Sequence, residues 1–130
     1  MAGETDLARL LAEMAPKPEG QDWGYAVVSG PLPEGLDWFA LVREAEGLTV
    51  IAPMVALRAA GFAAEGPMAR ITLTVHSALE AVGLTAAVSG ALAKAGISAN
   101  MVAGFHHDHI FLPAKDAEKA MAVLRGLSHA

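Results

Sequence analysis

The stretch from residue 70 to residue 127 switches between strand and helix periodicity, and this order limits the folds open to the chain. Apolar residues occupy every second position of the first predicted strand and every third or fourth position of the helix after it, which is typical of elements with one buried face. The sequence predicts strand, helix, two strands and helix over 70–76, 84–95, 99–106, 109–113 and 116–127. This β-α-β-β-α order favours an α+β ferredoxin-like sandwich, in which antiparallel strands carry their helices on one face.

The two strands over 99–113 predict a tight hairpin with His107-Asp108 as its turn, so that His106 faces His109. This register places one set of apolar side chains under the helices. The predicted core of this half is Ile71, Leu73, Val75, Leu84, Val88, Leu92, Met101, Phe105, Ile110, Leu112, Met121 and Leu124. The open face then carries Asn100, Val102, Gly104, His106, His109, Phe111, Thr72, Thr74 and His76. Because part of this face is apolar, we expect the other half or a second subunit to cover it.

The first half repeats this order of elements. Its pattern predicts a helix over 5–15, strands over 23–29, 38–44 and 48–52, a helix over 54–60, and loops or connectors over 16–22, 30–35 and 62–68. Strand, tight turn, strand, proline and helix occur in both halves, with Pro53 and Pro113 in corresponding places, which indicates an internal duplication. The second half lacks the last strand of a βαββαβ unit, so we expect the first half to supply it. The predicted halves are residues 1–62 and 63–130.

Composition excludes several classes of function. The chain of 130 residues is 54% hydrophobic and 18% charged, with a formal net charge of −5. Without a stripe of Lys and Arg we expect no nucleic-acid partner. No apolar run reaches the roughly 18 residues of a membrane span, and no signal peptide is evident, so we expect a cytoplasmic protein. The absence of cysteine excludes disulfides and thiolate chemistry.

One run of residues resembles a known family. The segment GLTAAVSGALAKAGISANMV (Gly83–Val102) resembles the signature of ACT domains, the small-molecule-sensing modules attached to aspartate kinases and other amino-acid enzymes. The longer run VHSALEAVGLTAAVSGALAKAGISANMVAGFHHDHIFLP is similar to stand-alone bacterial tandem ACT-domain proteins, and EAEGLTVIAP extends the likeness to the first half. The resemblance implies a duplicated ACT-type sandwich and a regulatory protein that binds a small molecule, expected to be an amino acid. It implies no catalysis and no cofactor, and we expect a homodimer or higher homo-oligomer.

A ligand site is predicted where the first strand ends and the first helix of the second half begins. Exposed backbone N–H groups at a helix start suit a carboxylate. The predicted ligand-binding residues are His76, Ser77, Gly83, Leu84, Thr85 and Asn100, and the resemblance implies an amino acid there. Asn100 is included because the start of the next strand is expected to lie nearby. As an alternative, Ser77 and Glu80 form only a capping box, S-x-x-E.

Three other groups of residues suggest chemistry. The run His106-His107-Asp108-His109 resembles a metal cluster, and a metal-dependent or hydrolytic enzyme using these histidines is the alternative function. We expect no bound metal and no Ser77 triad, because the predicted register puts His76 about 16 Å from the hairpin tip. Glu44 and Glu46, at a hairpin end, are candidates for binding a ligand's ammonium group, although a solvated turn is commoner.

Overall fold

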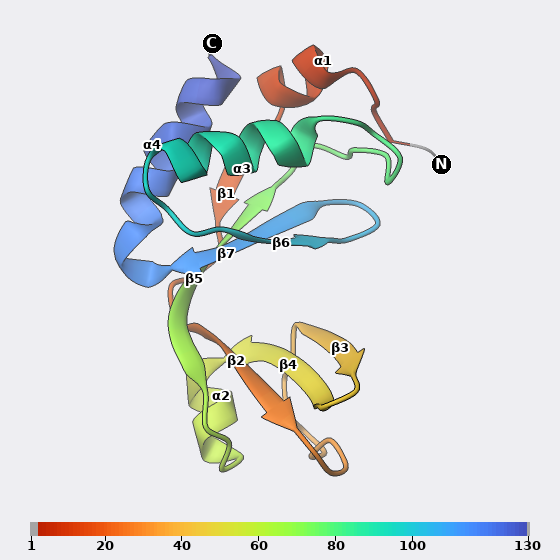
Figure 1. Ribbon diagram of the computed structural model, residues 1–130, viewed down its shortest axis with the longest axis vertical. Coiled ribbons are helices and arrows are strands. Elements are labelled where there is room, and N and C mark those ends of the chain that lie inside the picture. Colours follow the sequence, from red (N-terminus) through yellow and green to blue (C-terminus); the bar gives the residue numbers. More distant parts are fainter. Residues whose placement is uncertain (1–2, 130) are drawn as a thin grey trace. The chain divides into compact units, whose positions relative to one another are not determined.

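The structure, a computed structural model, describes residues 3–129, which form two compact units (Figure 1). The discontinuous unit combines the residues up to Gly20 with those from Ala69 onward, and the central unit spans Gln21–Met68. The sequence-based division into 1–62 and 63–130 does not coincide with these units, because the first twenty residues pack with the second half of the chain. Each unit is an α+β ferredoxin-like layer of antiparallel strands and helices, as predicted.

The discontinuous unit contains most of the helices. Its elements are α1 (Leu7–Ala12), β1 (Pro16–Pro18), the end of β5 (Glu65–Leu73), α3 (Leu84–Lys94), β6 (Asn100–Ala103), β7 (Asp108–Pro113), the 3-10 helix η1 (Ala114–Asp116) and α4 (Ala117–Ser128). The strand order is β1-β5-β7-β6. Strand β1 is the fourth strand that the second half lacks, so the prediction that the first half completes this sheet is confirmed.

The prediction of a loop over residues 16–22 is therefore wrong at its start. Lys17 pairs with Thr72, and Pro16 and Pro18 pair with the residues on either side of Thr72. Two prolines fit here because β1 lies at the edge of its sheet, where the ladder does not need every backbone N–H. The preceding helix is shorter than predicted, and its N-cap is Asp6, whose Oδ1 accepts a hydrogen bond from Arg9 N at 3.2 Å.

The core of this unit follows the predicted faces. Ile71 and Leu73 are buried under the helices, whereas Thr72 points to the opposite face. The other predicted core residues that are fully buried are Leu84, Val88, Leu92, Ile110, Leu112, Met121 and Leu124, and Val75 and Met101 pack at its border. Phe105 differs, because it is 59% exposed. Phe111 alternates with Ile110 and Leu112 and is not part of this core, as predicted, and it is fully buried on the opposite face.

The hairpin register differs from the predicted one. Ala103 pairs with Asp108, not with Leu112, so the register is displaced by four residues. The connection is a loop of residues 104–107, closed by a hydrogen bond from Gly104 N to His107 O at 2.8 Å. A Cβ at position 104 would lie 2.8 Å from the same oxygen, so a glycine is required for this closure. Because four is even, strand residues such as Met101 and Ile110 keep their predicted face.

The central unit has the same strand order, but it has no helix that corresponds to α3. It consists of β2 (Trp23–Val28), β3 (Ala40–Glu44), β4 (Gly47–Pro53), α2 (Met54–Ala59) and the start of β5, in the order β3-β4-β2-β5. The strands can be counted as β2, β3, β4, β5 in the central unit and as β5, β6, β7, β1 in the discontinuous unit. With this count both sheets have the order second, third, first, fourth, which supports the predicted duplication. Residues 62–68, predicted as a connector, enter β5 at Glu65. Helix α2 packs on β2 and β4 over a small apolar core.

Candidate functional site

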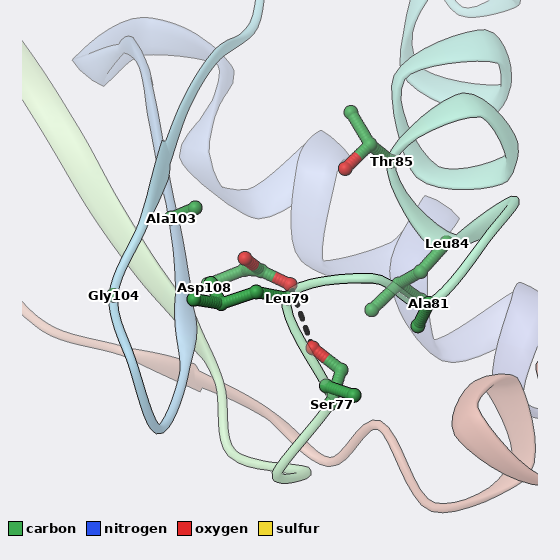
Figure 2. Close-up of a pocket in the computed structure, with 9 residues that line it drawn as sticks. Ser77, Leu79, Ala81, Leu84, Thr85, Ala103, Gly104 and Asp108 are labelled. Atoms are coloured by element: carbon green, nitrogen blue, oxygen red, sulfur yellow. Dashed lines mark hydrogen bonds between the residues drawn. The ribbon is translucent and has the colours of Figure 1, made fainter. Parts of the chain in front are cut away.

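A small cavity lies in the discontinuous unit, between the loop after β5, the start of α3 and the β6–β7 hairpin (Figure 2). Its volume is about 80 Å³. The lining residues are Ser77, Ala78, Leu79, Ala81, Leu84, Thr85, Ala103, Gly104 and Asp108. Of the six predicted ligand-binding residues, three therefore line one cavity, namely Ser77, Leu84 and Thr85. The other three, His76, Gly83 and Asn100, lie outside its lining.

Ser77 connects the loop after β5 to the hairpin. Its side chain is largely buried, and its Oγ donates a hydrogen bond to Asp108 Oδ2 at 3.2 Å (Figure 2). The backbone on either side of Ser77 is held by Glu4, whose N donates to His76 O at 2.9 Å and whose O accepts from Ala78 N at 3.0 Å. The alternative of a Ser77–Glu80 capping box is not what the structure has, because α3 begins only at Leu84 and its cap is Gly83.

Gly83 shapes the start of α3 without lining the cavity. Its φ of 105° is a left-handed conformation that disfavours other residues, and a Cβ there would lie 3.0 Å from a side-chain carbon of Leu7. No side chain caps this helix start. The first backbone N–H groups of a helix have no partner within the helix, and Leu84 and Thr85, the first two residues of α3, line the cavity. Figure 2 shows the Thr85 side chain directed toward the space between α3 and the hairpin.

Asn100 is not part of this cluster, contrary to the prediction. It lies at the start of β6, pairs with Phe111, and donates from Nδ2 to the Phe111 carbonyl oxygen at 3.3 Å. Helix α3 runs back along the sheet before β6 begins, so the end of β6, not its start, reaches the end of β5. Ala103 and Gly104 accordingly line the cavity where Asn100 was expected.

The histidines lie at the same end of the unit as Ser77, so the predicted separation of about 16 Å is wrong. The rings of His76 and His106 are 5.3 Å apart between centroids, and Phe105 lies 6.2 Å from His76. The predicted distance requires an extended strand up to residue 106, whereas β6 ends at Ala103 and the chain turns there. Proximity does not produce a triad, because the hydrogen-bond partner of Ser77 is a carboxylate, not an imidazole.

His106 and His109 do not face each other, because β7 pairs His109 with Val102. Within residues 3–129 no group of three His, Cys, Asp or Glu side chains is arranged to hold a metal ion. His109 belongs to a polar network on the sheet face opposite the helices. Its Nδ1 lies 3.0 Å from Thr72 Oγ1, which donates to Glu19 Oε2 at 3.2 Å, and Arg70 pairs with the same carboxylate at 3.2 Å.

This network changes the acidity of two of its members. Burial lowers the pKa of His109 below its ordinary 6.5, and the charges of Arg70 and His107 lower it further. Burial by itself raises the pKa of Glu19, but the hydrogen bond from Thr72 and the charge of Arg70 outweigh it, so the pKa of Glu19 lies below 4.5. The network stabilises a neutral imidazole and an ionised carboxylate, and it does not line the cavity.

Asp108 lines the cavity but is not among the predicted ligand-binding residues. The predicted turn assigned its carboxylate to the hairpin tip, whereas the observed register makes it the first residue of β7, opposite Ala103. Gly104, four residues before it, was the available signal for a wider loop. The other acidic candidates lie elsewhere: Glu44 accepts a hydrogen bond from Thr49 within its own hairpin, and Glu46 is exposed.

The architecture and the comparisons with known proteins agree on the family. Two family models, both described as ACT domain, match residues 2–69 and 68–126. The chain belongs to the ACT domain family. Its two ACT matches meet at residues 68 and 69, inside β5, where the structure also divides its two units.

Solved structures extend this likeness over almost the whole chain. A protein of unknown function from Vibrio cholerae, described as a possible transport protein, is 41% identical, with 94% of this chain and 95% of that chain covered and a TM-score of 0.85. An Agrobacterium tumefaciens protein is 19% identical, with 87% of each chain covered and a TM-score of 0.73. The ligand-free regulatory subunit of Thermus thermophilus aspartate kinase is 13% identical, with 89% and 97% covered and a TM-score of 0.65.

The last two likenesses concern the fold alone. The search of curated proteins found no match. Among the described residues, no helix has the length and apolar character needed to cross a membrane.

Proposed function

We propose that this ACT protein is a regulatory module without catalytic activity of its own, and that it binds a small amino or carboxylic acid in the cavity at the start of α3. One observation carries the proposal: Ser77, Thr85 and Asp108, from three separate segments, line a single cavity beside an uncapped helix start. The described regulatory-subunit relative supports a regulatory role.

The helix start supplies the recognition of an acid. Its unpartnered N–H groups and the positive end of the helix dipole favour a carboxylate, worth typically about 0.3–1 kcal/mol for an exposed group. The Thr85 hydroxyl can donate one further hydrogen bond to the ligand. In a chain with a net charge of −5, this local positive potential gives an acid a defined place to bind.

Binding there has a route to the rest of the unit. A ligand in the cavity touches the loop after β5, α3 and the hairpin together, and so adds contacts that hold these three segments in one arrangement. Leu79, Val82 and Phe105, at the same end of the unit, are 69%, 83% and 59% exposed. Such exposed apolar side chains support the proposal that ligand binding changes self-association, and we include a homo-oligomer in the proposal.

The test is a thermal-shift screen of the purified, tag-free protein over the amino acids, the matching carboxylic acids and divalent metals. A ligand at a hundredfold excess over its Kd adds about 2.7 kcal/mol of stability. Thr85→Val should weaken binding of the best acid several-fold, because the hydroxyl beside the helix start is lost. Ser89→Ala is the matched control, since Ser89 lies one turn later on α3 and its hydroxyl bonds to Thr85 O.

The outcomes separate the two function classes. Stabilisation by an acid that Thr85→Val weakens and Ser89→Ala does not would support the proposal. A response to a divalent metal alone, removed by His106→Ala, would contradict it in favour of the metal-dependent alternative. Light scattering with and without the stabilising acid measures whether the molar mass changes with occupancy.

A further inference from the structure

We infer that Asp108 makes the cavity selective for the smallest α-amino acids, because its carboxylate binds the ligand's ammonium group. The inference rests on the proposed function and deepens it, since a carboxylic acid without an amino group would satisfy the helix start alone. It concerns a residue whose place in the cavity follows from the observed register of β6 and β7.

Charge is the first argument. Among the described residues that line the cavity, Asp108 carries the only charged side chain. An ionised carboxylate has roughly four acceptor positions, and the hydrogen bond from Ser77 uses one of them on Oδ2. An ammonium group has three donors and no acceptor, so it complements the remaining acceptor positions of the Asp108 carboxylate. Ser77 also fixes the orientation of the carboxylate, because its own backbone is held on both sides by Glu4.

The position of the charge relative to α3 is the second argument. The cavity has the helix start on one side and Asp108 on another (Figure 2). A zwitterion can place its carboxylate against the N–H groups and its ammonium against Asp108. A hydroxy acid or simple carboxylic acid would bring a negative charge close to Asp108 with no compensating cation, which disfavours binding at these short distances.

Size is the third argument. The cavity of about 80 Å³ is well below the roughly 300–1,000 Å³ of ordinary ligand pockets, and about half the ~150 Å³ of an engineered cavity that holds benzene. The side chains of Ala78, Ala81 and Ala103 form its walls together with Gly104. This room suits glycine or alanine, whereas a branched side chain such as that of leucine exceeds it.

The experiment compares matched ligand pairs by calorimetry at pH 7. Glycine is paired with glycolate and alanine with lactate, so that each pair differs only in an ammonium group or a hydroxyl group. We expect the amino member to bind at least tenfold more tightly, and leucine to bind at least tenfold more weakly than alanine. Asp108→Asn should reduce the affinity for glycine at least tenfold and remove most of the difference within each pair.

The control is Glu80→Gln, which removes a negative charge from the same loop at a residue that does not line the cavity. It should keep the preference for glycine. Ser77→Ala retains Asp108 but removes the hydrogen bond that orients its carboxylate, so it should reduce the preference for glycine over glycolate, and it keeps the inference testable if Asp108→Asn does not fold.

The outcomes distinguish the inference from the proposed function. If glycolate binds the unaltered protein as tightly as glycine, or if folded Asp108→Asn keeps the preference, the inference is overturned while the proposed function stands. Leucine binding as tightly as alanine would overturn the size limit. If none of these five acids binds but another amino or carboxylic acid stabilises the protein in the screen, the inference fails and the proposed function stands. If no acid of the screen binds, both fail.

Discussion

The two units share one strand order but differ in the segment after their first strand. In the discontinuous unit β5 leads through a loop into α3, whereas in the central unit β2 leads into residues 29–39, which contain no helix. The run Gly30-Pro31-Leu32-Pro33 explains this, because two prolines within four residues oppose a helical turn. The candidate cavity lies beside the start of α3, for which the central unit has no counterpart after β2, so the duplicated sheet does not by itself produce the candidate site.

The central unit has a hollow of a different kind. Its volume is about 370 Å³, and its lining residues are Tyr25, Ala26, Val27, Thr49, Ala63 and Glu65. This hollow is larger than the cavity at α3, but it lies on strands and on the segment before β5, and it has no helix start to bind an anion. The comparison shows that the placement of donors and charge, more than volume, distinguishes the two units.

The largest expected effect tests whether the site depends on one unit. Leu92 and Leu57 are fully buried in the separate cores of the two units. Leu92→Ala and Leu57→Ala should each lower the free energy of unfolding by about 2–5 kcal/mol, measured by urea denaturation. Only Leu92→Ala should also weaken binding of the acid found by screening, because Leu92 anchors α3.

Val55→Ala is the control for that pair, because Val55 is 69% exposed and should change stability by less than about 0.5 kcal/mol. Equal loss of binding in Leu92→Ala and Leu57→Ala would show that the site does not belong to one unit.

The next effect concerns the helix that only one unit has. Gly83→Ala should lower the free energy of unfolding by about 1–3 kcal/mol, since Gly83 has a φ of 105°. Gly90→Ala, in the middle of the same helix with open space around it, should raise stability by about 0.5–1 kcal/mol. Thermal and urea unfolding measure both variants, and a loss of stability in Gly83→Ala together with a gain in Gly90→Ala would confirm the described helix start. A change in stability of the same sign in both variants would mean that α3 begins elsewhere.

A smaller effect tests whether the first residues belong to the discontinuous unit. Asp6→Ala should cost about 1 kcal/mol, because the Asp6 carboxylate caps α1. Asp116→Ala is the matched comparison, since Asp116 precedes α4 without a side-chain capping bond. A larger urea-unfolding loss for Asp116→Ala than for Asp6→Ala would contradict the described packing of α1 in this unit.

The smallest effect is a difference in pH dependence between the units. His109 has a lowered pKa, so the unfolded chain takes up a proton near pH 6.5 before the folded chain does. Stability should therefore fall as the pH drops below about 6.5, and Glu19 should add a further loss below 4.5. His109→Gln should flatten the first step in urea titrations between pH 8 and 5.5. If His109→Gln leaves the pH dependence of stability unchanged, the His109 network does not cause the loss of stability below pH 6.5.

The central unit should respond at the other end of the scale. Burial raises the pKa of Tyr25 above 10, so its neutral form is favoured in the folded chain and stability falls as the pH rises beyond that value. Tyr25→Phe should reduce this alkaline loss and leave the acid limb unchanged, which unfolding curves at pH 9–11 would show.

Several features of the site were open to prediction from sequence. The proximity of Ser77, Leu84 and Thr85 is predictable because a strand end, a loop and a helix start are local patterns, and their role in binding stays a prediction. The need for a further strand also followed from the sequence, because an order of β-α-β-β-α leaves one strand of the sandwich missing. That Pro16–Pro18 fills this place did not follow, since two prolines are a signal against a strand except at a sheet edge.

The sequence by itself determined which face of each element is buried. Period-2 and period-3.6 patterns are set by neighbouring residues, so the sequence alone predicts Ile71, Leu73, Val88 and Leu92 in the core, where the structure places them. These faces survived even a hairpin register displaced by four residues, because an even displacement returns each side chain to the same side of the sheet.

Only the tertiary structure decided which ends meet. The direction of β6 after α3 places Ala103 and Gly104, not Asn100, beside Ser77, and the Gly104–His107 closure brings Asp108 into the cavity. Both outcomes depend on where the chain turns and on close contacts between residues distant in sequence. Alternation along a strand carries no information about either, because it is the same for every even register.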